Sequence, residues 1–137
     1  MFMESKIKYN QVKLEPMIYV SDIEASIKFY SEILNFKVVE YYPDDKNPRW
    51  VAIQIGDQRF AMGNTFKNIN HKYHPNGING SGVHFYIIVE NIEEVYQKLK
   101  SSVSIIDKLE KKPWGNTEFA IKDPDGYLIS FSDPNKS

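Results

Sequence analysis

The sequence predicts an α+β fold of two βαβββ modules whose curved mixed sheets surround a cleft. Two β-hairpin patterns, at 50–62 and 113–131, lead to this prediction, because in each of them two alternating apolar runs flank a turn dipeptide. A shift of 69 residues lays the first turn over the second. The same shift lays residues 18–24 over 87–93. Two distant segments that share one offset indicate an internal duplication.

The first module begins with a predicted strand at 12–20, and the polar residues before it are expected to form a loose tail or an arm that packs on a partner. Ser21 or Asp22 offers an N-cap oxygen to the helix that follows. The apolar residues of this helix fall on one stripe: Ile23, Ile27, Tyr30, Ile33 and Leu34. Asn35 is expected to end it in a left-handed turn. Three strands then follow, at 36–42, 50–55 and 58–62 around the turn Gly56-Asp57.

The second module repeats this order. A strand at 83–89 leads to an Asn91 cap and a helix with one apolar stripe. A weaker strand at 104–109 has its exit loop at 110–113. The closing hairpin turns at Asp125-Gly126, where positive φ is expected and where Pro124 sets the bend.

Length and composition favour one soluble domain. The predicted organisation is a single domain over 1–137, with repeats at 12–64 and 81–133 and a connector at 65–80. A net charge of −1 argues against a nucleic-acid partner. Lys108, Lys111 and Lys112 are interrupted by Glu110 and are interpreted as solvated surface.

The chain has no cysteine, which excludes disulfides, thiolate nucleophiles and sulfur-ligated metals. No apolar run approaches the roughly 20 residues of a membrane span, so no membrane partner is expected. Residues 1–10 lack the apolar segment of a signal peptide, and a cytoplasmic protein is therefore the expectation.

Three segments, 16–30, 34–36 and 113–126, resemble the vicinal oxygen chelate superfamily of glyoxalases, bleomycin resistance proteins and dioxygenases. The resemblance extends over roughly residues 12 to 133. It implies the two-module fold, and it assigns no activity, since this fold hosts unrelated chemistries.

In the metal-dependent members of that superfamily each module supplies two metal ligands. The resemblance places these four positions at Glu15, Ala61, His84 and Ser130. Ala61 has no donor atom, and Ser130 is a weak neutral ligand. Only Glu15 and His84 remain as good metal ligands, whereas a stable metal site needs three or four of them. A slip of one residue would bring Met62 into the Ala61 position. The sequence therefore resembles the bleomycin-resistance-like branch, which binds its ligand with no metal or other cofactor.

This branch implies a homodimer whose clefts form across the subunit interface, and we expect it to sequester a planar or amphipathic small molecule. The expected ligand-binding residues are Tyr42, Trp50, Phe60, Met62, Phe66, His84, Trp114 and Glu118. Core or interface packing is the alternative for the two tryptophans, and a solvent-facing position is the alternative for Glu118. His84 is also explained as a histidine with a satisfied hydrogen bond.

No catalytic residue is predicted, and the question of enzymatic activity stays open. The alternative function is a metal-dependent lyase or dioxygenase-like enzyme with a non-standard site, built on Glu15 and His84 with His71 or His74. His71 and His74 are three residues apart, but the surrounding Asn, Pro and Gly argue against a helix there. A third possibility is a module whose dimer surface serves another protein.

Overall fold

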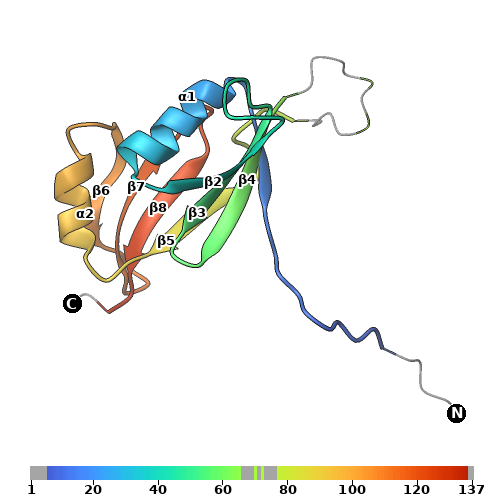
Figure 1. Ribbon diagram of the computed structural model, residues 1–137. Coiled ribbons are helices and arrows are strands. Elements are labelled where there is room, and N and C mark those ends of the chain that lie inside the picture. The colour runs from blue at the N-terminus through green and yellow to red at the C-terminus, as the bar shows by residue number, and fades with distance from the viewer. Residues whose placement is uncertain (1–5, 66–69, 71, 73–76, 136–137) are drawn as a thin grey trace, which may run out of the picture.

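Each module folds into one four-stranded mixed sheet with an α-helix packed on it (Figure 1). The computed structural model describes residues 6–65, 70, 72 and 77–135. The first module contains β1 (Met17–Val20), α1 (Ile23–Lys28), the π-helical turn η1 (Phe29–Ile33), β2 (Lys37–Tyr42), β3 (Trp50–Ile55) and β4 (Gln58–Asn64). The second contains β5 (His84–Ile88), α2 (Ile92–Leu99), β6 (Ile105–Lys111), β7 (Thr117–Lys122) and β8 (Leu128–Asp133).

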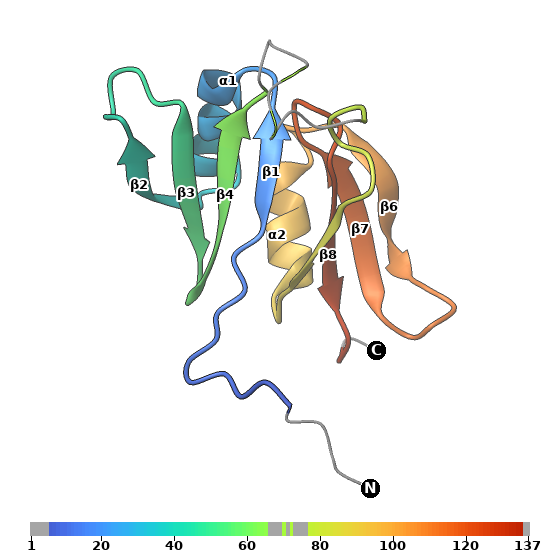
Figure 2. The same ribbon diagram turned by 90° about the vertical axis from the view of Figure 1, so that its right-hand side faces the viewer.

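The two sheets have equivalent strand orders, β1-β4-β3-β2 and β5-β8-β7-β6. In each sheet the first and last strands of the module pair in parallel, with Met17 opposite Ala61 and Tyr86 opposite Ser130. Both members of the second pair lie 69 residues after those of the first. Figure 2 shows the two sheets side by side, with α1 and α2 on the same side of them. The predicted α+β fold of two βαβββ modules is confirmed. No helix in the described part of the chain is long and apolar enough to cross a membrane.

The first helix begins and ends as the sequence predicts. The Asp22 carboxylate accepts a hydrogen bond from the Ala25 amide at 3.2 Å, which makes Asp22 and not Ser21 the cap. Asn35 has a φ of 60° and stops the helix in the left-handed region. The π-helical turn between them was not predicted.

The two hairpins differ in their turns. Ile55 pairs with Gln58, so the first hairpin has a two-residue loop, and Gly56 takes a φ of 59°. In the second hairpin Lys122 pairs with Leu128, and five residues separate them. Gly126 has the expected positive φ, 89°, but Asp123 starts the turn, because its side chain accepts bonds from the amides of Asp125 and Tyr127, both at 2.9 Å. The expected tight Asp125-Gly126 turn is thus a wider one.

Two further expectations are corrected. The first strand starts at Met17 and not at residue 12, since Pro16 has no N–H for the sheet and residues 6–16 form an extended arm. Lys112 is not solvated surface. It is 7% exposed, and its ammonium contacts the carboxylates of Asp107 at 2.8 Å and Glu110 at 3.1 Å.

A hydrophobic core fills the space between the sheets and the helices. Phe119 is fully buried there, edge-on to Tyr96 at 5.1 Å and stacked on Phe131 at 5.2 Å between ring centroids. The core includes Ile18, Val20, Tyr30, Val51, Ile53, Phe60, Met62, Ile92, Phe119, Ile121, Ile129 and Phe131.

The β7–β8 turn joins the second module to the first. The Tyr30 hydroxyl donates to Asp123 Oδ2 at 2.7 Å, and the Ser21 amide donates to Asp125 Oδ1 at 3.0 Å. Burial raises the pKa of the Asp123 carboxyl above its usual range. Burial and the neighbouring Asp123 charge raise the pKa of the Tyr30 phenol above its usual value. This junction therefore favours a neutral tyrosine.

Tyr30→Phe is expected to lower the free energy of unfolding by about 1–3 kcal/mol at pH 7, because a buried carboxylate oxygen loses its donor. The variant should also change the pH dependence. Since the pKa of Tyr30 is raised in the folded state, its contribution to stability is present below pH ~10 and is lost as pH rises further, when only the unfolded chain ionises. Urea unfolding at pH 7 and at pH ~9 to ~11 measures both effects. Tyr41→Phe, at an exposed tyrosine, is the control, and an identical alkaline loss in wild type and Tyr30→Phe would refute the assignment.

Candidate functional site

Strand alternation divides the side chains of each sheet between the core and an open face, which is the face away from the helices. On β4 and β8 the core side chains are Phe60, Met62, Ile129 and Phe131. Ala61 and Ser130 lie between them and therefore belong to the open faces. The four positions that the family resemblance singles out lie on or beside these faces. Glu15 lies two residues before β1 and His84 is the first residue of β5, while Ala61 and Ser130 lie on β4 and β8.

A buried carboxylate lies on the open face of the second sheet. Glu118, on β7, is 4% exposed. Its Oε2 accepts hydrogen bonds from Ser132 Oγ at 2.8 Å, Trp114 Nε1 at 3.2 Å and Asn116 Nδ2 at 3.5 Å. Within the described residues no Lys, Arg or His forms an ion pair with Glu118. The alternative of a solvent-facing Glu118 is therefore wrong.

Two exposed aromatic rings flank this carboxylate. Trp114 is 61% exposed and Tyr86 is 51% exposed. Together with Asn116 and Glu118 they line a shallow, open hollow of about 400 Å³. A carboxylate beside aromatic faces can hold a positively charged group and the planar body attached to it.

His84 extends the same face along β5. Its Nε2 lies 2.8 Å from Ser130 Oγ, and its ring centroid lies 4.6 Å from that of Tyr86. The open face of the second sheet, which comprises His84, Tyr86, Trp114, Asn116, Glu118, Ser130 and Ser132, is thus a continuous set of polar and aromatic groups.

The residues at the family's metal positions do not fit a metal centre. The Glu15 carboxylate is held by Arg59 Nε at 2.5 Å, and Arg59 also contacts Glu40 at 3.2 Å. Ala61 has no donor, and His84 is engaged by Ser130. In the described ranges no group of three or more His, Cys, Asp or Glu side chains is arranged to hold a metal ion.

The structure brings together three of the eight expected ligand-binding residues, His84, Trp114 and Glu118. Tyr42 and Trp50 lie on the first sheet, where they pair across β2 and β3. Phe60 and Met62 are 5% and 0% exposed and belong to the core.

The eighth expected ligand-binding residue, Phe66, lies outside the described part of the chain. So do His71 and His74, the two histidines of the alternative metal site. Sequence reasoning missed Tyr86, Asn116 and Ser132. Period-two alternation was the available signal for Tyr86 and Ser132, because each lies two residues after a position that the resemblance had already placed on the open face, His84 and Ser130.

Comparison with known families and structures agrees with the two-module fold. A family model described as the Glyoxalase/Bleomycin resistance protein/Dioxygenase superfamily matches residues 10–131. A curated relative, "Glyoxalase 1" of Caenorhabditis elegans, is 24% identical over an alignment of 132 positions that covers 86% of this chain and 42% of that protein. The chain thus spans less than half the length of this relative.

Two solved structures illustrate the range of proteins with this fold. The antibiotic binding protein TnmS3 from Streptomyces sp. CB03234 superposes with a TM-score of 0.68 at 20% identity, over 93% of this chain and 100% of that chain. A lactoylglutathione lyase from Agrobacterium tumefaciens gives a TM-score of 0.70 at 16% identity, over 91% and 95%. At these identities the similarity establishes the fold alone.

Proposed function

Because the chain belongs to the Glyoxalase/Bleomycin resistance protein/Dioxygenase superfamily, we propose that it is a cytoplasmic, homodimeric small-molecule-binding protein that works without a metal ion. The ligand lies against the open face of the second sheet. It is planar or amphipathic, and it carries a positively charged group.

The observation that carries this proposal is the buried carboxyl group of Glu118, which accepts hydrogen bonds from Trp114, Asn116 and Ser132. This carboxyl group is 4% exposed, its hydrogen-bond donors are neutral, and no cationic side chain among the described residues pairs with it. A bound cation would compensate the charge of the carboxylate, with Glu118 as its acceptor. Trp114 and Tyr86 offer ring faces to the rest of the ligand. Asn116 and Ser132 hold the carboxylate in place through bonds to Oε2.

The donor set supports metal independence. Glu15 is engaged by Arg59, and Ala61 and Ser130 replace the stronger donors of the metal-dependent enzymes. An antibiotic binding protein with the same fold supports a binding role as well. With its hydrogen bond to Ser130, His84 is assigned to ligand binding and not to catalysis.

The alternative is a metal-dependent lyase or dioxygenase-like enzyme. The curated relative named glyoxalase favours it, although the chain spans 42% of that protein. Such an enzyme would need Glu15 and His84 together with His71 or His74.

Metal analysis combined with a thermal-shift screen separates the two functions. The protein is purified without chelator, its metal content is measured by mass spectrometry, and it is titrated with nickel, zinc, manganese and iron. We expect no stoichiometric metal. In the presence of chelator, planar aromatic compounds that carry a protonated alkylamine should raise the unfolding temperature more than matched neutral or anionic analogues do. Near-stoichiometric metal that is lost in Glu15→Ala or His84→Ala would instead favour the enzyme.

A further inference from the structure

The two oxygens of the Glu118 carboxyl group have different surroundings. The hydrogen bonds that the described residues make to this group all go to Oε2, from Ser132 Oγ at 2.8 Å, Trp114 Nε1 at 3.2 Å and Asn116 Nδ2 at 3.5 Å. In the same part of the chain no donor bonds to Oε1. Since a carboxylate oxygen has about two lone-pair sites, Oε2 is saturated and Oε1 keeps its full capacity to accept.

The donors to Oε2 are held by the fold. Ser132 is fully buried on β8, directly opposite Glu118 on β7. Asn116 Nδ2 donates to Ser132 Oγ at 3.1 Å, and the Ser132 hydroxyl in turn donates to the carboxyl group. Turning the carboxyl group to exchange its two oxygens would break these bonds. The oxygen that remains for a ligand is therefore Oε1.

The glutamate beside Glu118 already has its cations. Glu110 lies opposite Glu118 in the pairing of β6 with β7. Its carboxylate lies 3.1 Å from Lys112 Nζ and 3.9 Å from Lys108 Nζ. Lys112 is 7% exposed and also contacts Asp107 at 2.8 Å, so this lysine is engaged. Of the two paired glutamates, Glu118 is the one to which the described residues bring no cation.

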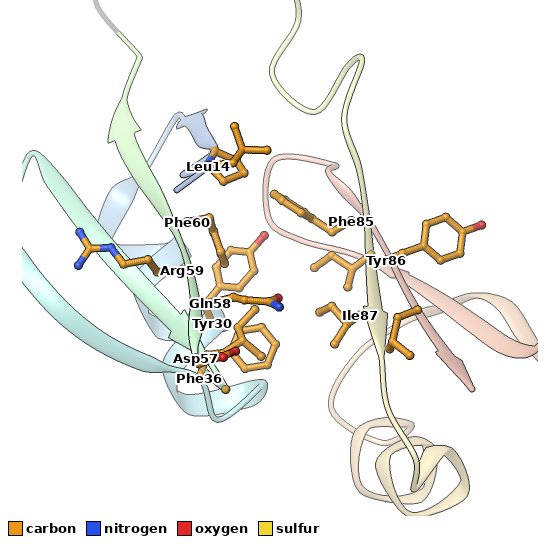
Figure 3. Close-up of a pocket in the computed structure, with 15 residues that line it drawn as sticks. Leu14, Tyr30, Phe36, Asp57, Gln58, Arg59, Phe60, Phe85, Tyr86 and Ile87 are labelled. Carbon is orange, nitrogen blue, oxygen red and sulfur yellow. The ribbon is translucent and has the colours of Figure 1, made fainter. Parts of the chain in front are cut away.

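Two aromatic rings offer their faces beside this carboxyl group. Figure 3 shows the hollow between the β3–β4 hairpin and β5, with Phe85 pointing into it and Tyr86 pointing away from it. Strand alternation accordingly places Tyr86 on the open face of the second sheet, where Trp114 also lies. Both rings are more than half exposed. A flat group can therefore lie on them while its charged end reaches Glu118.

The common organic cations differ in the acceptors that they need. A guanidinium group is planar and donates two parallel N–H bonds, one to each oxygen of a carboxylate. At Glu118 the second of these bonds would meet Oε2, to which Trp114 and Ser132 already donate. An ammonium group is a compact point charge whose donors can turn toward a single oxygen. The free Oε1 therefore matches an ammonium group.

We propose that the positively charged group of the ligand is an ammonium group with at least one N–H, which donates to Glu118 Oε1 alone. This assignment rests on the proposed function and deepens it by naming the class of cation that the site selects. Alkylammonium groups bind in preference to guanidinium groups and to quaternary ammonium groups, which have no N–H. Trp114 determines the first preference, because its indole N–H occupies Oε2 beside the hollow that Trp114 lines.

Calorimetric titration with three probes that share one ring tests the selection. The probes are naphthalene compounds with a methylene-linked primary ammonium, guanidinium or trimethylammonium group, and chelator is present throughout. We expect the primary ammonium probe to bind about 10-fold more tightly than either of the others, as one charge-assisted hydrogen bond predicts. A guanidinium or trimethylammonium probe that binds as tightly as the primary ammonium probe would overturn the proposal.

Trp114→Phe separates the indole N–H from the aromatic ring. The phenyl ring keeps a flat face, whereas Oε2 loses one donor beside the hollow. We expect the ratio of the guanidinium to the ammonium dissociation constant to shrink by about 3-fold or more, because a guanidinium group can then bond to both oxygens. Trp50→Phe, on β3 of the first sheet, is the matched control and should leave this ratio unchanged. The same ratio in wild type and Trp114→Phe would also overturn the proposal.

A failure of the proposed function gives a different result in the same titrations. If none of the three probes binds, the cation site at Glu118 is wrong, and the selection for ammonium is wrong with it. If all three bind with equal affinity and Glu118→Gln weakens all of them, the cation site stands and the selection alone is refuted.

Discussion

Phe119→Ala is expected to lower the free energy of unfolding by about 3–5 kcal/mol, the cost of emptying a large buried aromatic site. Phe119 is 0% exposed, and its ring contacts those of Tyr96 and Phe131, so its removal leaves a cavity between α2 and the second sheet. A loss of this size is a large part of the total stability of a typical domain. Urea unfolding followed by circular dichroism measures it.

Phe85→Ala is the matched control, because Phe85 on β5 is half-buried at the margin of the hydrophobic core. We expect it to cost less than half as much as Phe119→Ala. Equal losses in the two variants would contradict the assignment of Phe119 to the core and of Phe85 to its margin.

Glu118→Gln is expected to weaken the binding of a planar aromatic compound with a protonated alkylamine about 10- to 100-fold, which is what the loss of one charge-assisted hydrogen bond corresponds to. The glutamine side chain has nearly the same size, and its oxygen can still accept from Trp114 and Ser132. The fold should therefore be retained. Calorimetric titration in the presence of chelator measures the change.

A neutral analogue of the same amine supplies the internal comparison, since its affinity should change little in Glu118→Gln. Glu90→Gln, at an exposed glutamate just after β5, serves as the control variant. If Glu118→Gln weakened the amine and its neutral analogue alike, Glu118 would be acting through the shape of the site and not through its charge.

The sequence predicted the fold because its signals were local and occurred twice. Each hairpin carries its own turn residues, and one shift of 69 related the turns and also the first strands. The same shift relates the strand register in the structure, Met17 with Ala61 and Tyr86 with Ser130. A repeated pattern of this kind determines strand order because equivalent strands must pair in equivalent ways.

The errors in the predicted fold arose where one side chain changes the local backbone. Pro16 delays the first strand until Met17, and Asp123 widens the second turn by accepting two backbone amides. Lys112 is buried, and its ammonium group contacts the carboxylates of Asp107 and Glu110 on β6. The spacing of charged residues along the sequence does not predict these contacts.

The site was predictable only in part. Alternation places Glu118 on one of two faces of β7, but it does not say that Trp114, Asn116 and Ser132 surround its carboxylate. Those contacts depend on the path of the β6–β7 loop and on the pairing of β7 with β8, with Glu118 opposite Ser132. The two tryptophans, which the sequence grouped together, lie in different modules: Trp50 is on β3 of the first sheet, and Trp114 is in the loop between β6 and β7.

The most direct test of the central claim uses Trp114 as its reporter. The chain has two tryptophans, so a Trp50→Phe variant leaves the emission of Trp114 alone to be followed while a planar aromatic compound with a protonated alkylamine is added in the presence of chelator. Metal-free binding on the open face of the second sheet predicts a saturable change in this emission at one ligand per chain. A flat emission in Trp50→Phe, together with a saturable change in Trp114→Phe, would place the ligand elsewhere and contradict the proposed site.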